Sequence, residues 1–101
     1  MAAYKVGAEG GDASCQYMVG SMCLDGEGVA VDFKQALPWI EKAVAQDDPS
    51  AVGALGVMYM DGEGVTPSFR RAREHYERAI ELGSTGAVKN MQILDQEIQQ
   101  V

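Results

Sequence analysis

The chain has no long hydrophobic run and no signal-peptide pattern at its start. A membrane-spanning helix needs about 20 consecutive apolar residues, and no stretch of this sequence approaches that length. Residues 1–7 lack the basic start and the long apolar core of a secretory signal. The sequence therefore predicts no membrane partner, and a cytoplasmic location is the expectation.

Cysteine and histidine are also scarce, because the chain holds two cysteines and one histidine. If Cys15 and Cys23 lie on one helix, their Cα atoms are about 12 Å apart, whereas a disulfide requires about 7 Å or less. Both are expected to be free, buried thiols in a reducing compartment. Two thiols and the distant His75 do not supply the four ligands of a structural zinc site, so no metal is expected.

Positive charge is in short supply, with 8 Lys and Arg against 15 Asp and Glu and a net charge of −7. Such a surface repels nucleic acids and anionic membranes, so neither is expected as a partner. A neutral or basic protein or peptide is easier to accommodate. The 101 residues, 47% of them hydrophobic and none in a low-complexity tract, suit a single folded domain.

What the sequence does contain is a repeat. The stretch Asp25-Gly26-Glu27-Gly28-Val29 returns 36 positions later as Asp61-Gly62-Glu63-Gly64-Val65. A fixed period of a few tens of residues indicates an array of similar structural units. We therefore divide the chain into a remnant helix or tail (1–11), a first repeat (12–47), a second repeat (48–83) and a partial repeat that forms a C-terminal cap (84–101).

Within each repeat, apolar residues spaced by three and four predict two helices. The expected helices cover residues 13–24 and 33–46, then 49–60 and 69–82, and a last helix follows Ser84. Gly20 and Gly56 recur inside a helix, which predicts close approach of a neighbouring helix at both places. Pro38 predicts a kink in its helix rather than a break.

The glycine-rich loops raise the question of ligand binding. A calcium loop needs several oxygen ligands at alternate positions and a late glutamate, and a phosphate loop needs a nearby lysine; neither pattern is present. We interpret the loop as a structural turn made by Gly26, Gly28, Val29, Gly62, Gly64 and Val65.

No arrangement typical of catalysis accompanies these loops. His75 has no serine, cysteine or carboxylate pattern around it, so we expect it to be a packing residue and the protein not to be an enzyme. The arginines of residues 69–82 form i, i+4 pairs with glutamates, which predicts a solvated outer face rather than an RNA-binding stripe. The expected pairs are Arg70 with Glu74, Arg73 with Glu77 and Glu74 with Arg78.

At this level of detail residues 12–29 resemble the first half of a Sel-1-like repeat, a relative of the tetratricopeptide repeat. The family pattern has a leucine-glycine pair, a tyrosine and a G-x-G-V loop, matched by Leu55-Gly56, Tyr59 and Gly62 to Val65. Its second helix is matched by Ala36, Trp39, Lys42 and Ala43, and by Ala72, Tyr76 and Ala79. Cys23, His75 and Pro38 depart from the pattern.

The resemblance implies an all-α fold, a right-handed α/α superhelix of two helix pairs with a C-terminal capping helix. It also implies a non-catalytic adaptor or scaffold without cofactors, which binds a peptide or helix on its concave face. By register with the family, the candidate protein-binding residues are Tyr17, Ser21, Leu24, Gly53, Val57, Met60, Lys89 and Ile93, with Ser14, Ser50 and Gly86 on the same face.

A second hypothesis is that the chain is a self-assembling structural unit. Two complete repeats fall short of the about 3 that a stable stack usually needs. Copies docking edge to edge as a homo-oligomer would supply the missing contacts. The alternative on the candidate face itself is that its small residues only fill a tightly curved superhelix.

Overall fold

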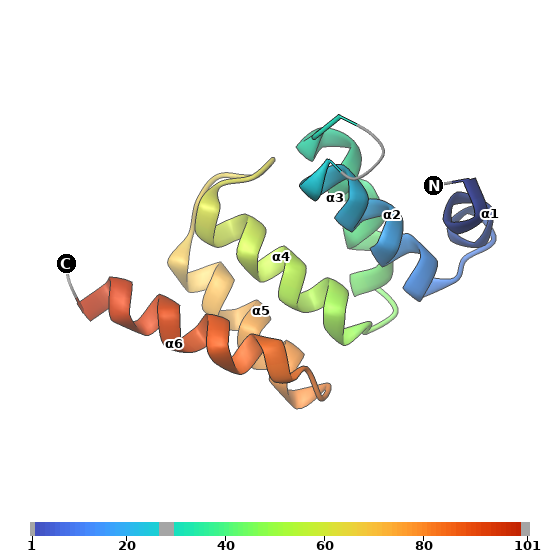
Figure 1. Ribbon diagram of the computed structural model, residues 1–101. Helices are drawn as coiled ribbons and strands as arrows, with labels where there is room; N and C mark the ends of the chain where they lie inside the picture. Colours follow the sequence, from blue (N-terminus) through green and yellow to red (C-terminus); the bar gives the residue numbers. More distant parts are fainter. Residues whose placement is uncertain (1, 27–29, 100–101) are drawn as a thin grey trace.

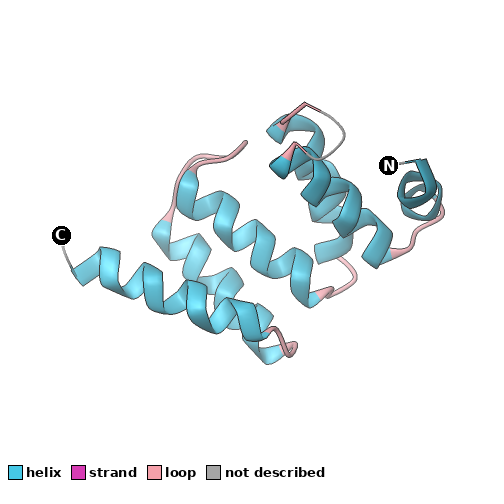
Figure 2. Ribbon diagram, in the orientation of Figure 1, coloured by secondary structure: helices cyan, strands magenta, loops and turns pink. Residues whose placement is uncertain are grey.

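The computed structural model describes residues 2–26 and 30–99, and these residues form helices joined by short loops (Figure 1). The helices are α1 (Ala2–Glu9), α2 (Ala13–Asp25), α3 (Phe33–Val44), α4 (Pro49–Asp61), α5 (Phe69–Glu81) and α6 (Thr85–Gln99). Figure 2 shows helix and loop only, and no strand, in this described part of the chain. The predicted all-α class is confirmed.

Consecutive helices pack on one another to form a row of helical hairpins. The most extensive contacts are between α2 and α3 and between α4 and α5, with α1 packed on α2 and α6 on α5. Figure 1 looks onto α2, α4 and α6, with α3 and α5 behind them. The result is an elongated molecule of 43 × 27 × 18 Å. None of the described helices has the length and apolarity that crossing a bilayer requires.

Side-chain caps define where the helices begin. The N-cap side chain accepts a hydrogen bond from the backbone N–H three residues later, which satisfies a donor that the first turn leaves free. The caps and their N···O distances are Asp12 (2.9 Å), Asp32 (3.1 Å), Asp48 (3.2 Å), Ser68 (3.2 Å) and, before α6, Ser84 (3.4 Å). The starts predicted for α2, α3, α4 and α5 are therefore confirmed.

The turns between hairpins recur at the same 36-residue spacing. The backbone N–H groups of residues 12, 48 and 84 donate to the carbonyl oxygens of residues 7, 43 and 79, at 3.0, 3.2 and 2.9 Å. The end of α1 thus has the same backbone geometry as the ends of α3 and α5. This relation places α1 where a second helix of a preceding hairpin would lie.

The two helices of each hairpin approach closely at a glycine. A Cβ added to Gly56 would lie 2.6 Å from the Tyr76 ring, and one added to Gly20 would lie 2.6 Å from Cδ1 of Ile40. Real Cβ atoms do not come this near, so only glycine permits this helix separation at either position. The close approach predicted from the recurrence of these glycines is confirmed.

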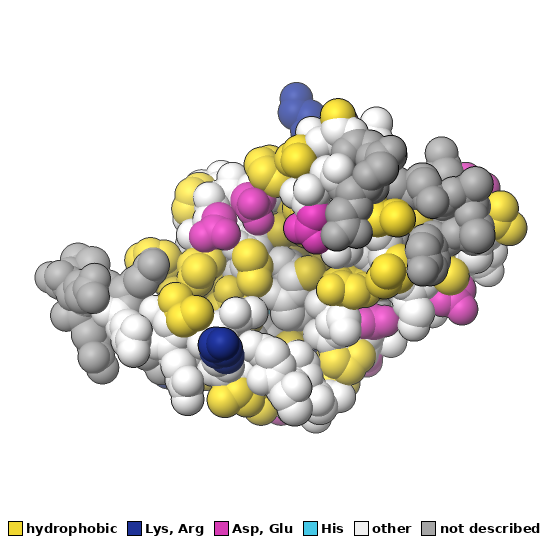
Figure 3. All heavy atoms as spheres, viewed as in Figure 1, with side chains coloured by type: hydrophobic (Ala, Val, Ile, Leu, Met, Phe, Trp, Pro, Cys, Tyr) yellow, Lys and Arg dark blue, Asp and Glu magenta, His cyan; other side chains and the backbone are white. Residues whose placement is uncertain are grey.

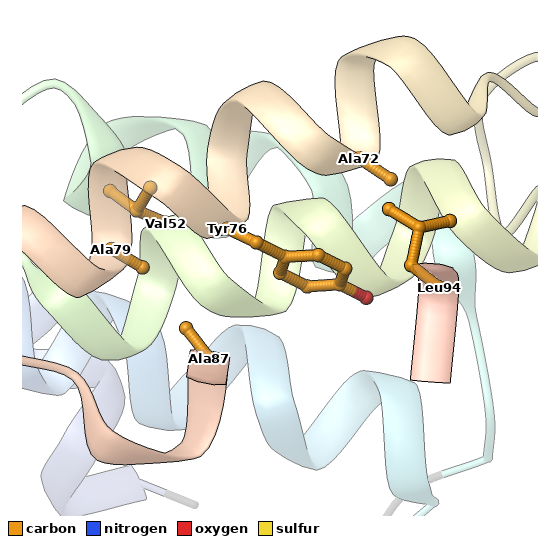
Figure 4. Packing of buried hydrophobic residues seen from close by; sticks show 6 residues of the cluster. All are labelled: Val52, Ala72, Tyr76, Ala79, Ala87 and Leu94. Atoms are coloured by element: carbon orange, nitrogen blue, oxygen red, sulfur yellow. The ribbon is translucent and has the colours of Figure 1, made fainter. Parts of the chain in front are cut away.

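Tyr76 lies at the centre of the larger core cluster. Its side chain is fully buried, as are those of its neighbours on α4, α5 and α6. Figure 4 shows the ring pointing toward Leu94, with the other members around it. The cluster consists of Val52, Ala72, Tyr76, Ala79, Ala87 and Leu94. Burial of Ala87 and Leu94 makes α6 part of the core, as one apolar face of a surface helix requires.

A second cluster joins the first hairpin to the second. It is built from Ile40 of α3 with Leu55 and Met58 of α4, and Val65 of the second loop packs against it. Helix α3 continues through Pro38 even though proline removes one backbone hydrogen bond from a helix interior. The buried stripe of Ala36, Ile40 and Ala43 runs past the proline on both sides.

Several sequence-based expectations need correction. Helix α3 ends at Val44 rather than Gln46, because the chain turns at Asp47, which has φ 58°. Cys15 is half-buried, whereas Cys23 is buried, and the two cysteines are not joined in a disulfide. Arg70–Glu74 and Arg73–Glu77 pair as predicted, each at 3.3 Å.

Arg78 was expected to pair with Glu74. Its terminal nitrogens instead contact Asp47 at 3.2 Å and Glu81 at 3.3 Å. Asp47 holds the pKa of the Arg78 guanidinium above its usual range by hydrogen bonding, and Glu81 acts in the same direction. The turn after α3 therefore approaches α5, and the difference from the prediction follows from that contact.

Candidate binding surface

A groove runs across the face formed by α2, α4 and the start of α6. It encloses about 790 Å³ and lies open to solvent. Figure 3 shows it as a hollow with apolar side chains along its walls. We call it the α2–α4–α6 groove, and its lining is Tyr17, Ser21, Leu24, Asp25, Pro49, Ser50, Gly53, Ala54, Val57, Asp61, Glu63, Gly83, Ser84, Thr85, Gly86, Ala87 and Asn90.

The repeat explains why these residues meet. Tyr17 and Gly53 are equivalent positions 36 residues apart, and so are Ser21 and Val57. Stacking one hairpin on the next therefore brings the same face of α2 and of α4 to one side of the molecule. Residues three and four apart share one face of a helix, which extends this surface along each helix.

Five of the eight candidate binding residues lie in the α2–α4–α6 groove, namely Tyr17, Ser21, Leu24, Gly53 and Val57. Ser50 and Gly86, placed on the same face, also line it. Tyr17 and Leu24 are half-buried because they pack at the edge of the second core cluster. The groove wall is thus continuous with the hydrophobic core.

The other candidates lie outside the groove lining. Met60 packs against the larger core cluster, and its Sδ accepts a hydrogen bond from Tyr76 Oη at 3.8 Å. Lys89 and Ile93 are exposed on α6, with 41% of Ile93 accessible to solvent. Ser14 is exposed near the start of α2. These four residues are outside the groove, so the groove covers only part of the face that the register with the family predicts.

Sequence reasoning missed the acidic part of the groove. Asp25 ends α2, Asp61 ends α4 and Glu63 follows in the loop, and all three line the groove. Burial raises the pKa of the Glu63 carboxyl, and the negative charges of Asp61 and then Asp25 raise it further. The recurrence of aspartate at positions 25 and 61 could have predicted this acidic part, because equivalent positions of two repeats come together when hairpins stack.

The glycines of the loops serve chain reversal. Gly26 and Gly62 cap α2 and α4 in the left-handed conformation, at φ 75° and 72°. Gly64, at φ 76°, faces the backbone of Phe33, where a Cβ would lie 3.1 Å from the carbonyl oxygen. Val65 covers the second core cluster. Gly28 and Val29 lie outside the described residues.

His75 packs against a neighbouring aromatic ring. Its ring is stacked on Tyr59 with centroids 5.4 Å apart, and Nδ1 donates a hydrogen bond to the carbonyl oxygen of Arg71 at 2.7 Å. The predicted packing role is confirmed. Within residues 2–26 and 30–99, no group of three His, Cys, Asp or Glu side chains could hold a metal ion.

Comparisons with known proteins agree with this geometry. The Sel1 repeat model matches residues 13–48 and again residues 49–84. The Sel1 repeat protein from Oxalobacter formigenes superposes with a TM-score of 0.80 and 35% identity, over 88% of this chain and 67% of that one. No curated protein matches the chain.

A second crystal structure is that of c5321, a protective antigen present in uropathogenic Escherichia coli strains and displaying an SLR fold. It superposes with a TM-score of 0.83 and 32% identity over 93% of this chain, which spans only 20% of that protein. Sel1 repeats are generally protein–protein interaction modules rather than enzymes. Two matched copies of the repeat, two superposable structures and the recurring glycine contacts lead to one conclusion: the chain belongs to the Sel1 repeat family.

Proposed function

We propose that this chain is a non-catalytic protein-interaction module and that the α2–α4–α6 groove receives a peptide or helix from its partner. One observation supports this function above the others. The groove gathers residues from both complete repeats and from α6 into a single concave surface. Its volume falls within the range of about 300–1,000 Å³ that is common for ligand pockets.

The chemistry of the lining suits recognition of a polypeptide. Tyr17, Leu24 and Val57 offer apolar contact, and Ser21 and Ser50 add hydroxyl groups that can donate and accept hydrogen bonds. Gly53 lines the groove without a side chain, which leaves room for a bound segment there. A mixed apolar and polar groove with a glycine in its lining favours an elongated peptide segment over a compact metabolite.

The test is selection of peptides followed by measurement of their affinity. Random 12-residue peptides displayed on phage are selected on the immobilised protein, and enriched sequences are synthesised and titrated by calorimetry. The groove variant Tyr17→Arg with Val57→Arg is expected to bind the enriched peptides at least ten-fold more weakly. Added bulk and charge at these two positions would block the groove.

Two controls keep this test decisive. The matched control Gln35→Arg with Ala45→Arg adds the same charge at exposed positions of α3 and its end, and should leave affinity unchanged. Because Tyr17 and Val57 are half-buried, Ser50→Arg at an exposed site of the groove provides a second variant, and circular dichroism checks folding. Equal binding to all folded variants, or no enrichment over uncoated support, contradicts the proposed function.

Self-association is a second candidate, favoured by one exposed residue on α6. Val88 is 43% exposed, whereas Val52, the equivalent residue of α4, is 1% exposed in the core. A second copy could cover Val88 and its neighbours. Light scattering after size-exclusion chromatography at high concentration decides the matter: a dimer that Val88→Glu converts to monomer supports it, and a strict monomer rejects it.

A further inference from the structure

We propose that the segment bound in the α2–α4–α6 groove carries a lysine or arginine next to an apolar residue, and that its positive charge lies among Asp25, Asp61 and Glu63. This inference rests on the proposed function and names the chemistry of the occupant. We call these three residues the acidic end of the groove.

The acidic end is produced by repeat stacking. Asp25 is the last residue of α2, and Asp61 is the last residue of α4 at the equivalent position of the next repeat. Glu63 follows two residues after Asp61 and lines the same groove. Figure 3 shows acidic side chains gathered on the side of the hollow where α2 and α4 end.

Three negative charges share this end of the groove without a positive side chain. None of the described residues that line the groove is Lys or Arg. Within the described parts of the chain, the ion pairs all lie elsewhere, on Arg70, Arg73 and Arg78. Among the side-chain hydrogen bonds of the described residues, Asp25 accepts a long one from Ser21 Oγ, at 3.5 Å. Burial raises the pKa of Glu63 most, and the negative charges of Asp61 and Asp25 raise it further, which agrees with repulsion among the three carboxylates.

The backbone adds to the negative potential. The C-terminal ends of helices carry a partial negative charge, and α2 and α4 both end beside these carboxylates. Cations are therefore favoured here by two helix ends as well as by three side chains. The net charge of −7 also attracts a cationic segment at long range.

The occupant is an organic cation rather than a metal ion. No group of three His, Cys, Asp or Glu side chains among the described residues could hold a metal ion. The three carboxylates of the acidic end are therefore not arranged around one metal position. A guanidinium or ammonium group on a long side chain spreads several N–H donors over a wider area. The apolar walls beside it, Leu24 and Val57, then suit an adjacent hydrophobic side chain.

The experiment compares selections on two proteins. Random 12-residue phage-displayed peptides are selected on the native chain and on a neutral variant that combines Asp25→Asn, Asp61→Asn and Glu63→Gln. Peptides from the native chain should be enriched in Lys or Arg adjacent to an apolar residue. Their affinity should fall at least ten-fold for the neutral variant, and at least five-fold between 50 mM and 500 mM salt.

A matched control removes three charges elsewhere, through Glu9→Gln, Glu41→Gln and Glu81→Gln at exposed sites of α1, α3 and α5. It should keep the native affinity and selection. Enriched peptides that depend on the groove yet lack a cation, or bind the neutral variant equally, overturn this inference and leave the proposed function intact. Peptides insensitive to the Arg substitutions in the groove overturn both.

Discussion

Gly56 lies so close to Tyr76 that a methyl group on its Cα would come within 2.6 Å of the ring carbon Cε1. The same ring is fully buried among residues of three helices. Its contact with the glycine fixes how near α4 comes to α5, and the pair Gly20 and Ile40 does the same for α2 and α3. The groove on the opposite side of α2 and α4 depends on these separations.

Gly56→Ala is expected to destabilise the protein by up to about 2 kcal/mol. Overpacking a core costs about 1–3 kcal/mol, and the better helix propensity of alanine returns about 1 kcal/mol. The buried tyrosine ring cannot rotate away, and the carbonyl oxygen of Ala72 lies 3.3 Å from the added atom. Urea unfolding followed by circular dichroism measures the change.

Gly53→Ala in the same helix is the matched control. Its added Cβ would meet only ordinary contacts, at 3.9 Å from Ala79 and 4.0 Å from Ser84. This variant should be as stable as the native chain or more stable by up to about 1 kcal/mol. If Gly56→Ala stabilises the protein as much as Gly53→Ala does, α4 and α5 are not in close contact at Gly56 and Tyr76.

Glu63→Gln is expected to stabilise the protein at neutral pH. The pKa of Glu63 in the folded chain lies above its ordinary value of 4.5, through burial and the charges of Asp61 and Asp25. The folded state therefore holds the charged carboxylate less readily than the unfolded chain, and stability is lost as pH rises through the interval above 4.5. Glutamine removes this loss.

The measurement is the urea midpoint of the native chain and of Glu63→Gln at pH 7 and at pH 3.5. The variant should be the more stable at pH 7, with little difference at pH 3.5, where the carboxyl is protonated in both states. Glu41→Gln, at an exposed site of α3, controls for the change in net charge. If the urea midpoints of the native chain and of Glu63→Gln differ by the same amount at both pH values, the pKa of Glu63 is not raised in the folded chain.

Cys15 is expected to react slowly with thiol reagents. Burial raises the pKa of its thiol above 9.0, and the neighbouring Asp12 carboxylate raises it further by its charge and by hydrogen bonding. Because the thiolate is the nucleophile, iodoacetamide at pH 8 should alkylate Cys15 more slowly than a cysteine in an unstructured peptide. Mass spectrometry of the digested protein measures the rate separately from that of buried Cys23.

Asp12→Asn isolates the electrostatic part of this effect. Asparagine caps a helix as well as aspartate, so α2 should keep its start. Loss of the negative charge lowers the thiol pKa, so the alkylation rate of Cys15 should rise. The cap variant Asp32→Asn at the start of α3 should leave the rate unchanged. An Asp12→Asn rate equal to or below the native one would be inconsistent with the assigned cause.

Most of the helical architecture could be predicted because the sequence pattern of one helical hairpin occurs twice in the chain. Equivalent glycines, N-cap residues and apolar stripes at 36-residue spacing identify the hairpins without reference to distant contacts. The end of α3 was harder, because Asp47 at φ 58° replaces the glycines found at equivalent residues 11 and 83. Its contact with Arg78 crosses from one hairpin to the next and leaves no local pattern.

Only part of the groove lining could be predicted from the sequence, because part of it depends on how the hairpins stack. Helical register identifies the face that carries Tyr17 and Val57, but it does not show how far the curvature of the stack extends a groove along that face. Met60 therefore turns to the core, while Asp25, Asp61 and Glu63 join the groove. These carboxylates come from the ends of two helices and a loop, and only the stacking of hairpins brings them together.

The most direct test of this account is a nuclear magnetic resonance titration with the tightest peptide obtained from the selection. Amide chemical-shift changes are followed across the whole chain as peptide is added. We expect the largest changes at groove residues such as Tyr17, Ser21 and Val57, with little change on the exposed faces of α3 and α5. Changes centred on those outer faces, or none at saturating peptide, would contradict the central claim.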